Sequence, residues 1–150
     1  TKDARVYLEK SDRKKMTDEE YLMRKLSIDL KENKIRIIKT DVREVVDLIV
    51  KQQGDPWSLL YILTSFGNYT LMQYVIGRIE LENQKYAAAC CPFKAMVKFM
   101  EKDTVGFLKN LKEAVAKAPE ETMSLFSGMF PEGLDVKDYY AYALGNSGIR

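Results

Sequence analysis

The sequence predicts an all-α fold, a compact multi-helix domain with two buried central helices and at most a marginal two-stranded element. The first observation is that residues 57–66 and 69–79 carry apolar side chains on every side, as a buried helix does. The second is that apolar residues elsewhere recur at the period of an amphipathic helix. The third is the composition, 46% hydrophobic and 31% charged, which is typical of a globular protein.

The chain of 150 residues is long enough for one domain with a core of its own. We expect a basic arm over residues 1–16 and a single helical domain over residues 17–150. Because the chain begins at Thr1 rather than at a methionine, we expect it to be a fragment of a longer protein. Gly67 and Asn68 interrupt the apolar run, so neither half approaches the ~20 apolar residues of a membrane span, and we expect no membrane partner.

The N-terminal third combines predicted strands and helices. Residues 6–8 form a strand-like patch, and residues 34–40 alternate enough to predict a short strand. Residues 17–20 read Thr-Asp-Glu-Glu, a capping box that predicts the start of a helix. Another helix is predicted over residues 41–54, with Asp41 as its N-cap.

The two central helices have a strong predicted start. Asp55 is the expected N-cap and Pro56 the first helical residue, where the missing N–H of proline costs nothing. Beyond the central pair, residues 82–91 are predicted to be helical and to be closed by Pro92. Four more short helices are predicted over residues 93–100, 103–117, 119–126 and 136–144.

Residue types needed for most enzymatic and metal chemistry are missing. The chain has no histidine, the commonest general base and transition-metal ligand, and no glycine-rich phosphate loop. Glu120 and Glu121 could serve acid–base chemistry, but a helix N-terminus favours negative charge in any case. The adjacent pair Cys90 and Cys91 cannot build a framework of bridges, and we expect both to be buried and unreactive. We therefore expect a protein without catalytic activity, cofactor or metal, in the reducing cytoplasm.

Basic residues form three groups that can contact the phosphates of a nucleic acid. They are the cluster Arg13, Lys14 and Lys15, the residues Lys34, Arg36 and Lys39, and the stripe Lys94, Lys98 and Lys102. The stripe has i, i+4, i+8 spacing, at which like charges destabilise a helix, and a polyanion would remove that repulsion. The alternative is a solvated face, because charge runs commonly do no more than that.

Tyrosines crowd the last predicted helix. Tyr139 and Tyr142 share one side of it at i, i+3 spacing, and Tyr140 lies between them. Aromatic faces stack on bases and hydroxyl groups reach phosphates, so we take Tyr139 and Tyr142 as candidate nucleic-acid contacts. Ordinary packing with the hydroxyl at the rim is the alternative.

The segment 139–147, Tyr-Tyr-Ala-Tyr-Ala-Leu-Gly-Asn-Ser, is similar to the aromatic–Tyr–Ala–aliphatic–Gly segment of nucleoproteins of non-segmented negative-strand RNA viruses. The order of the preceding elements also resembles that family: an apolar helix, a helix with small residues, a lysine-rich helix and a proline-containing loop. The resemblance covers residues 66–147. It implies a helical lobe of a protein that polymerises on RNA and clamps the backbone in a basic groove between two lobes.

We interpret the chain as a non-catalytic RNA-binding domain of the nucleocapsid type. Its expected partners are single-stranded RNA and other protein subunits, including further copies of itself. The alternative is a helical protein–protein interaction module that binds a partner helix in an apolar groove. Salt distinguishes the two, because phosphate binding weakens steeply as salt rises whereas helix-in-groove binding barely changes.

Overall fold

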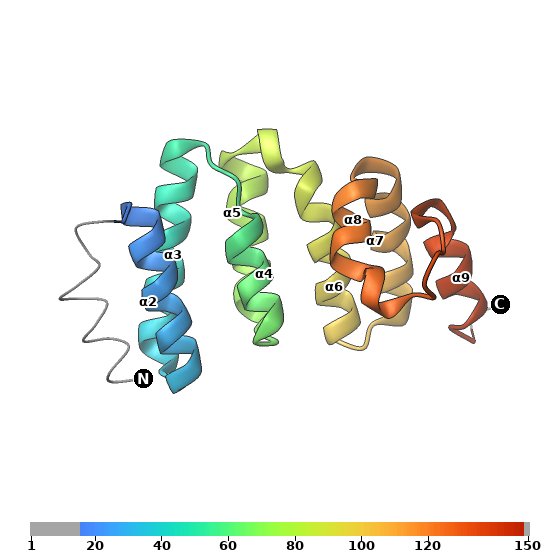
Figure 1. Cartoon of the computed structure of the whole chain (residues 1–150), viewed down its shortest axis with the longest axis horizontal. Coiled ribbons are helices and arrows are strands. Elements are labelled where there is room, and N and C mark those ends of the chain that lie inside the picture. The colour runs from blue at the N-terminus through green and yellow to red at the C-terminus, as the bar shows by residue number, and fades with distance from the viewer. Residues whose placement is uncertain (1–15, 149–150) are drawn as a thin grey trace. The chain divides into compact units, whose positions relative to one another are not determined.

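The computed structural model describes residues 16–148, and within them the fold is all-α, as predicted (Figure 1). These residues form eight α-helices, α2 to α9, together with four short 3-10 helices and no β-strand. The strand-like patch at residues 6–8 lies outside the described residues. The chain divides into two compact units, one ending at Leu71 and the other beginning at Met72, within α5. We describe each unit by itself.

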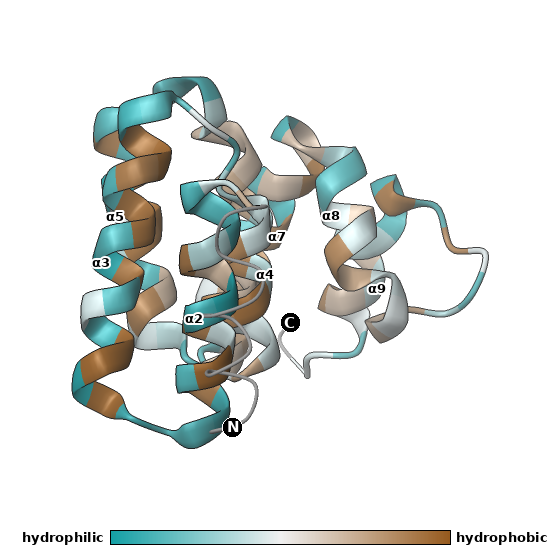
Figure 2. Ribbon diagram, turned by 60° about the vertical axis from the view of Figure 1, so that its left-hand side comes forward, coloured by the Kyte–Doolittle hydropathy of each residue, from teal (hydrophilic) through white to brown (hydrophobic). Residues whose placement is uncertain are grey.

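The first unit begins with two helices that pack against each other, α2 (Asp18–Glu32) and α3 (Ile35–Gln52). The predicted cap of α2 is present, because the Thr17 hydroxyl oxygen accepts a hydrogen bond from the Glu20 backbone N–H at 3.1 Å. Both helices carry buried aliphatic residues, and hydrophobic positions recur along their ribbons in Figure 2. They are Leu26, Ile28 and Leu30 on α2 and Ile38, Val42, Val45, Val46 and Ile49 on α3.

The predicted strand at residues 34–40 is wrong, and so is the predicted N-cap at Asp41. Both lie in or next to the first two turns of α3, and Asp41 is buried inside that helix. The physical reason is that Ile38 starts the buried stripe that runs on to Ile49, which has helical period over 12 residues. Within the short window 34–40 the same isoleucines resemble a strand, because so few residues cannot separate the two periods.

The α4 helix (Trp57–Ser65) follows a loop and is buried on one face. The helix begins one residue later than predicted, with Pro56 and not Asp55 at the N-cap position. The Asp55 carboxylate still accepts a hydrogen bond from the Trp57 N–H at 2.9 Å. Leu59, Leu60 and Leu63 are fully buried, but Phe66 is 42% exposed. The apolar residues therefore do not surround α4 as completely as the sequence suggested.

The α5 helix (Tyr69–Glu82) follows a turn in which Gly67 adopts a positive φ of 69°. Its buried residues are Met72, Val75, Ile76 and Ile79. The helix then stops at Glu82, and two 3-10 turns, Gln84–Tyr86 and Ala88–Cys90, replace the continuous helix predicted over residues 82–91. Pro92 does not close that segment but stands in the first turn of the next helix, where its missing N–H has no intrahelical partner to lose.

The rest of the second unit is built on the packing of α6 (Cys91–Met100) against α7 (Thr104–Lys117). The α8 helix (Pro119–Phe126) contacts both, and α9 (Tyr139–Gly145) packs on α7. Two further 3-10 turns, Ser127–Met129 and Val136–Asp138, lie between α8 and α9. Cys90 and Cys91 are buried, as predicted.

No helix within residues 16–148 has both the length and the apolar character needed to cross a membrane.

Candidate nucleic-acid interface

A run of touching aromatic rings extends through the second unit. Phe107 lies 5.5 Å from Phe99 and 6.0 Å from Phe126, measured between ring centroids. Phe130 lies 6.5 Å from Phe126 and is stacked on Tyr139 at 4.0 Å. The same Phe130 ring meets Tyr142 edge-on at 5.8 Å. Four helices and the loop after α8 thus contribute to one aromatic cluster.

Where this cluster reaches the surface, it lines a pocket of about 610 Å³. The pocket lies at the turn between α6 and α7 and is completed by the 3-10 turn after α8 and by α9. Phe99 and Tyr142 are 50% and 41% exposed, so their rings are accessible to a ligand. The residues that give the pocket its chemical character are Phe99, Phe107, Phe130, Tyr142, Met129 and Lys102.

Lys102 lies just beyond the end of α6, in the left-handed conformation with φ 63°. Its N–H donates to the Phe99 carbonyl at 3.1 Å, and the next N–H, of Asp103, donates to the Lys98 carbonyl at 3.0 Å. This pattern is a Schellman motif, in which glycine is the usual residue at the left-handed position. Lys102 is exposed, and no carboxylate in residues 16–148 forms an ion pair with it.

The three lysines predicted as one helical stripe are not equivalent. Lys94 and Lys98 are on α6, whereas Lys102 is in the turn after it. The Lys94 ammonium is 2.9 Å from the Glu80 carboxylate, and the Lys98 ammonium is 3.5 Å from Glu101. Partial burial alone would lower the pKa of Lys94, but the hydrogen bond to Glu80 and its negative charge raise it. The predicted mutual repulsion of the stripe is therefore offset by acidic partners.

The two candidate tyrosines have different environments. Tyr139 is 2% exposed, and one face of its ring is covered by Phe130, so it contributes to packing. Tyr142 lines the pocket. The Lys112 ammonium lies 5.5 Å from the ring centroid of Tyr140.

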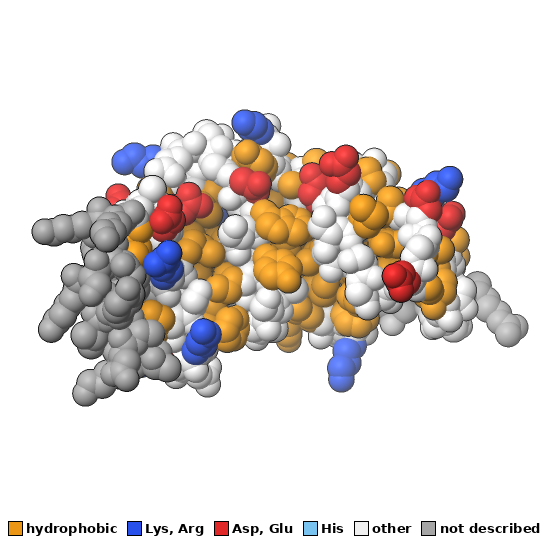
Figure 3. Space-filling view, in the orientation of Figure 1, with side chains coloured by type: hydrophobic (Ala, Val, Ile, Leu, Met, Phe, Trp, Pro, Cys, Tyr) orange, Lys and Arg blue, Asp and Glu red, His pale blue; other side chains and the backbone are white. Residues whose placement is uncertain are grey.

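The other predicted basic residues belong to the first unit or fall outside the described residues. Lys34, just before α3, pairs with Glu32 at 2.8 Å, and Arg36 and Lys39 are exposed on the first turns of α3. Arg13, Lys14 and Lys15 precede the first residue that the structure describes. Within each unit, the basic side chains on the face shown in Figure 3 stand singly.

Sequence reasoning found Lys102 and Tyr142 but missed the apolar half of the pocket. Phe99 carried a usable signal, because it is an aromatic residue outside the buried stripe formed by Phe93, Met96 and Val97. Met129 and Phe130 carried none, because they come from the loop between two helices and their position depends on tertiary packing. Between residues 16 and 148, no group of three or more acidic or cysteine side chains is placed to hold a metal ion.

No protein-family model matches the chain, and neither a curated protein nor a solved structure gives a significant match to it.

Proposed function

We propose that the chain is a non-catalytic RNA-binding domain of the nucleocapsid type, which binds single-stranded RNA at the pocket between α6, α7 and α9. The observation that carries the proposal is the combination around one pocket of two exposed aromatic rings, Phe99 and Tyr142, with the cation of Lys102, which pairs with no carboxylate among residues 16–148. A single strand offers both groups that such a site binds, a base with two apolar faces and a phosphate next to it.

The magnitudes favour stacking as the main contribution at this site. Base stacking on an aromatic side chain contributes ~1–3 kcal/mol per base and tolerates any sequence. One exposed lysine supplies a single phosphate contact, and the formal net charge of the chain is only +2. A pocket of about 610 Å³ is within the usual size range of ligand sites.

The remaining parts of the interpretation are also proposals. The resemblance of residues 139–147 to viral nucleoproteins supports RNA as the ligand and self-association as a second property. Lys34, Arg36 and Lys39, and the cluster Arg13 to Lys15, are the other basic residues that we propose to contact phosphates. The cysteine content, two adjacent residues that are both buried, supports the reducing cytoplasm as the location.

One observation favours the alternative, a module that binds a partner helix. The pocket is lined mainly by apolar side chains. Val105, which is 68% exposed, directly follows the lining residue Thr104 in the chain. An apolar groove of this kind can accept the i, i+4 anchors of an amphipathic helix.

A salt-resolved titration distinguishes the two functions. We expect a fluorescently labelled single-stranded RNA to bind with an affinity that falls log-linearly as salt rises. Lys102→Gln should weaken binding and reduce the salt slope by about one, uniformly across RNA sequences. Lys109→Gln is the matched control, because Lys109 is an exposed lysine on α7 that does not line the pocket. Absence of RNA binding, or a salt slope that Lys102→Gln leaves unchanged, would contradict the proposal.

A further inference from the structure

We propose that Lys98 is a positioning residue of this site, which neutralises the two carboxylates on either side of Lys102 and does not itself contact phosphate. The inference rests on the proposed function. It gives two lysines of the predicted stripe different roles: Lys102 binds the ligand, and Lys98 neutralises the acidic residues of the turn.

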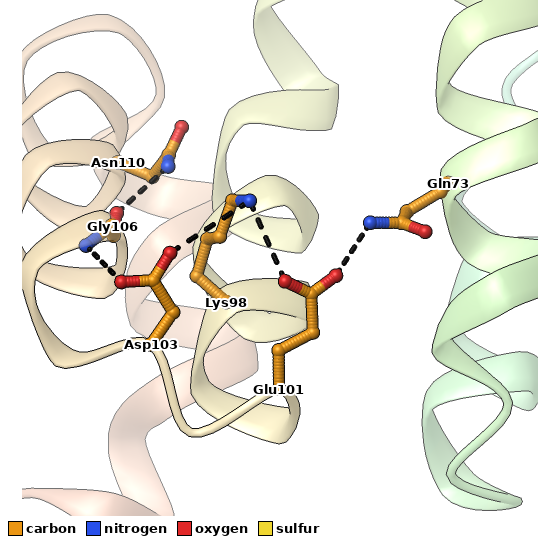
Figure 4. Close-up of polar contacts among 6 residues, drawn as sticks. All are labelled: Gln73, Lys98, Glu101, Asp103, Gly106 and Asn110. Atoms are coloured by element: carbon orange, nitrogen blue, oxygen red, sulfur yellow. Dashed lines mark hydrogen bonds and ion pairs between the residues drawn. The ribbon is translucent and has the colours of Figure 1, made fainter.

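The Lys98 ammonium lies between two carboxylates (Figure 4). It is 3.5 Å from Glu101 Oε2 and 3.9 Å from Asp103 Oδ2. These are the residues immediately before and after Lys102 in the chain. An ammonium already shared by two carboxylates has little charge to offer a phosphate.

Both carboxylates are held by further hydrogen bonds. Gln73 of α5 donates its side-chain amide to Glu101 Oε1 at 2.6 Å. Asp103 Oδ1 accepts from the Gly106 N–H at 2.9 Å, which caps the N-terminus of α7. Because neither carboxylate is free to swing away, their charges stay at the turn whether or not Lys98 is present.

The stem of Lys98 passes close to Gly106, in the first turn of α7. A Cβ atom on Gly106 would lie 3.0 Å from Lys98 Cδ and 2.4 Å from Asp103 Oδ2. Because Gly106 has no side chain, the Lys98 stem and the Asp103 carboxylate both fit beside the first turn of α7. The backbone carbonyl of Lys98 accepts the Asp103 N–H, so the same residue also holds the turn that carries Lys102.

The charges of the turn explain why this matters for an anion. Lys98, Glu101, Lys102 and Asp103 sum to zero, and removal of Lys98 leaves two carboxylates against one lysine. A phosphate that approaches Lys102 would then meet a net negative turn. With Lys98 in place, the carboxylates are neutralised and the Lys102 charge is available.

Five variants test the assignment by affinity and salt slope for labelled single-stranded RNA. Lys102→Met should lower the slope by about one. Lys98→Met should weaken binding by roughly threefold or more and leave the slope unchanged, because no phosphate contact is lost. Lys98→Arg should bind like the parent. Glu101→Gln in the Lys98→Met background should restore affinity, whereas the same change in the parent should have little effect.

This double-mutant cycle separates the two ways to fail. If Lys98 contacts phosphate directly, Lys98→Met lowers the slope by about one and its effect adds to that of Glu101→Gln, and the inference is overturned while the RNA site stands. If the parent protein binds no RNA, the proposed function itself fails. Circular dichroism of every variant, matched to the parent in helix content, excludes loss of folding as the cause of any weakening.

Discussion

Asp41 is a carboxyl group in the core between α2 and α3, where a charge is costly unless it is paired. It is 1% exposed, and the neighbouring Asp29 is completely buried. Burial is the main cause that raises the pKa of Asp41, the hydrogen bond with Asp29 adds to it, and the Lys25 ammonium at 3.3 Å opposes the rise, so that the pKa is about 7. Asp41 therefore keeps its proton at mildly acidic pH and loses it near neutrality.

The stability of the first unit should fall as pH rises from about 4 to about 7. Asp41 in the folded chain holds its proton over this range, whereas in the unfolded chain it has already released it, so rising pH favours unfolding. The shift sets an upper limit of ~4 kcal/mol on the loss. Fluorescence of Trp57, the only tryptophan, monitors urea unfolding of this unit as a function of pH.

Asp41→Asn should flatten this pH dependence and make the first unit more stable than the parent at pH 8. Asn lacks the titrating proton but can still donate a hydrogen bond to Asp29. Asp47→Asn, a change at an exposed position on the same helix, is the control and should keep the parent's profile. A profile for Asp41→Asn that matches the parent would show that the buried pair does not titrate in this range.

Two glycines inside helices should respond oppositely to alanine. A Cβ on Gly77 in α5 meets nothing within 4 Å, so Gly77→Ala should raise the free energy of unfolding by ~0.5–1 kcal/mol. Gly106→Ala places its Cβ 2.4 Å from the Asp103 carboxylate and displaces the α7 cap, so it should lower stability by ~1 kcal/mol. Chemical denaturation of the two variants side by side measures both signs. An increase for Gly106→Ala would mean that the cap contributes nothing.

At the scale of whole elements, long periodic segments were predicted well and short ones were not. The helices α2 and α7 begin where their capping residues placed them, whereas α6 begins at Cys91 and not at the predicted residue 93. The beginning of α3 was missed, because Ile35 and Ile37 are exposed there and only the stripe from Ile38 onward reports the helix. Pro92 was predicted to end a helix. A proline can follow the end of one helix or stand in the first turn of the next, and the sequence alone does not distinguish the two.

Truncation of a buried leucine in α4 should be among the most destabilising single changes. Leu60 is completely buried, and Leu60→Ala removes apolar surface and leaves a cavity, so it should cost ~2–5 kcal/mol. Tyr61→Ala, at the next position but 51% exposed, is the control and should cost much less. Thermal melting followed by circular dichroism compares them. Equal melting temperatures for Leu60→Ala and the parent would mean that α4 is not part of a core.

At the scale of the whole molecule, the sequence predicted the basic and hydroxyl-bearing part of the candidate site but not its enclosure. Lys102 and Tyr142 stand out by residue type and spacing. The ion pair of Lys94 with Glu80 depends on how α5 and α6 come together across the 3-10 turns between them, so spacing alone could not distinguish Lys94 from Lys102. The pocket depends on Phe130, a loop residue that joins Tyr139 and Tyr142 to the rings of α7 and α8.

The most direct test of the central claim is a nuclear magnetic resonance titration of the isotopically labelled 17.3 kDa chain with a single-stranded RNA oligonucleotide. We expect the largest shifts at the aromatic signals of Phe99 and Tyr142 and at the backbone amide of Lys102, with small changes on the exposed face of α7 around Lys109. Strong shifts confined to residues outside the pocket, or no shifts at RNA concentrations that saturate an ordinary single-strand binder, would contradict the account.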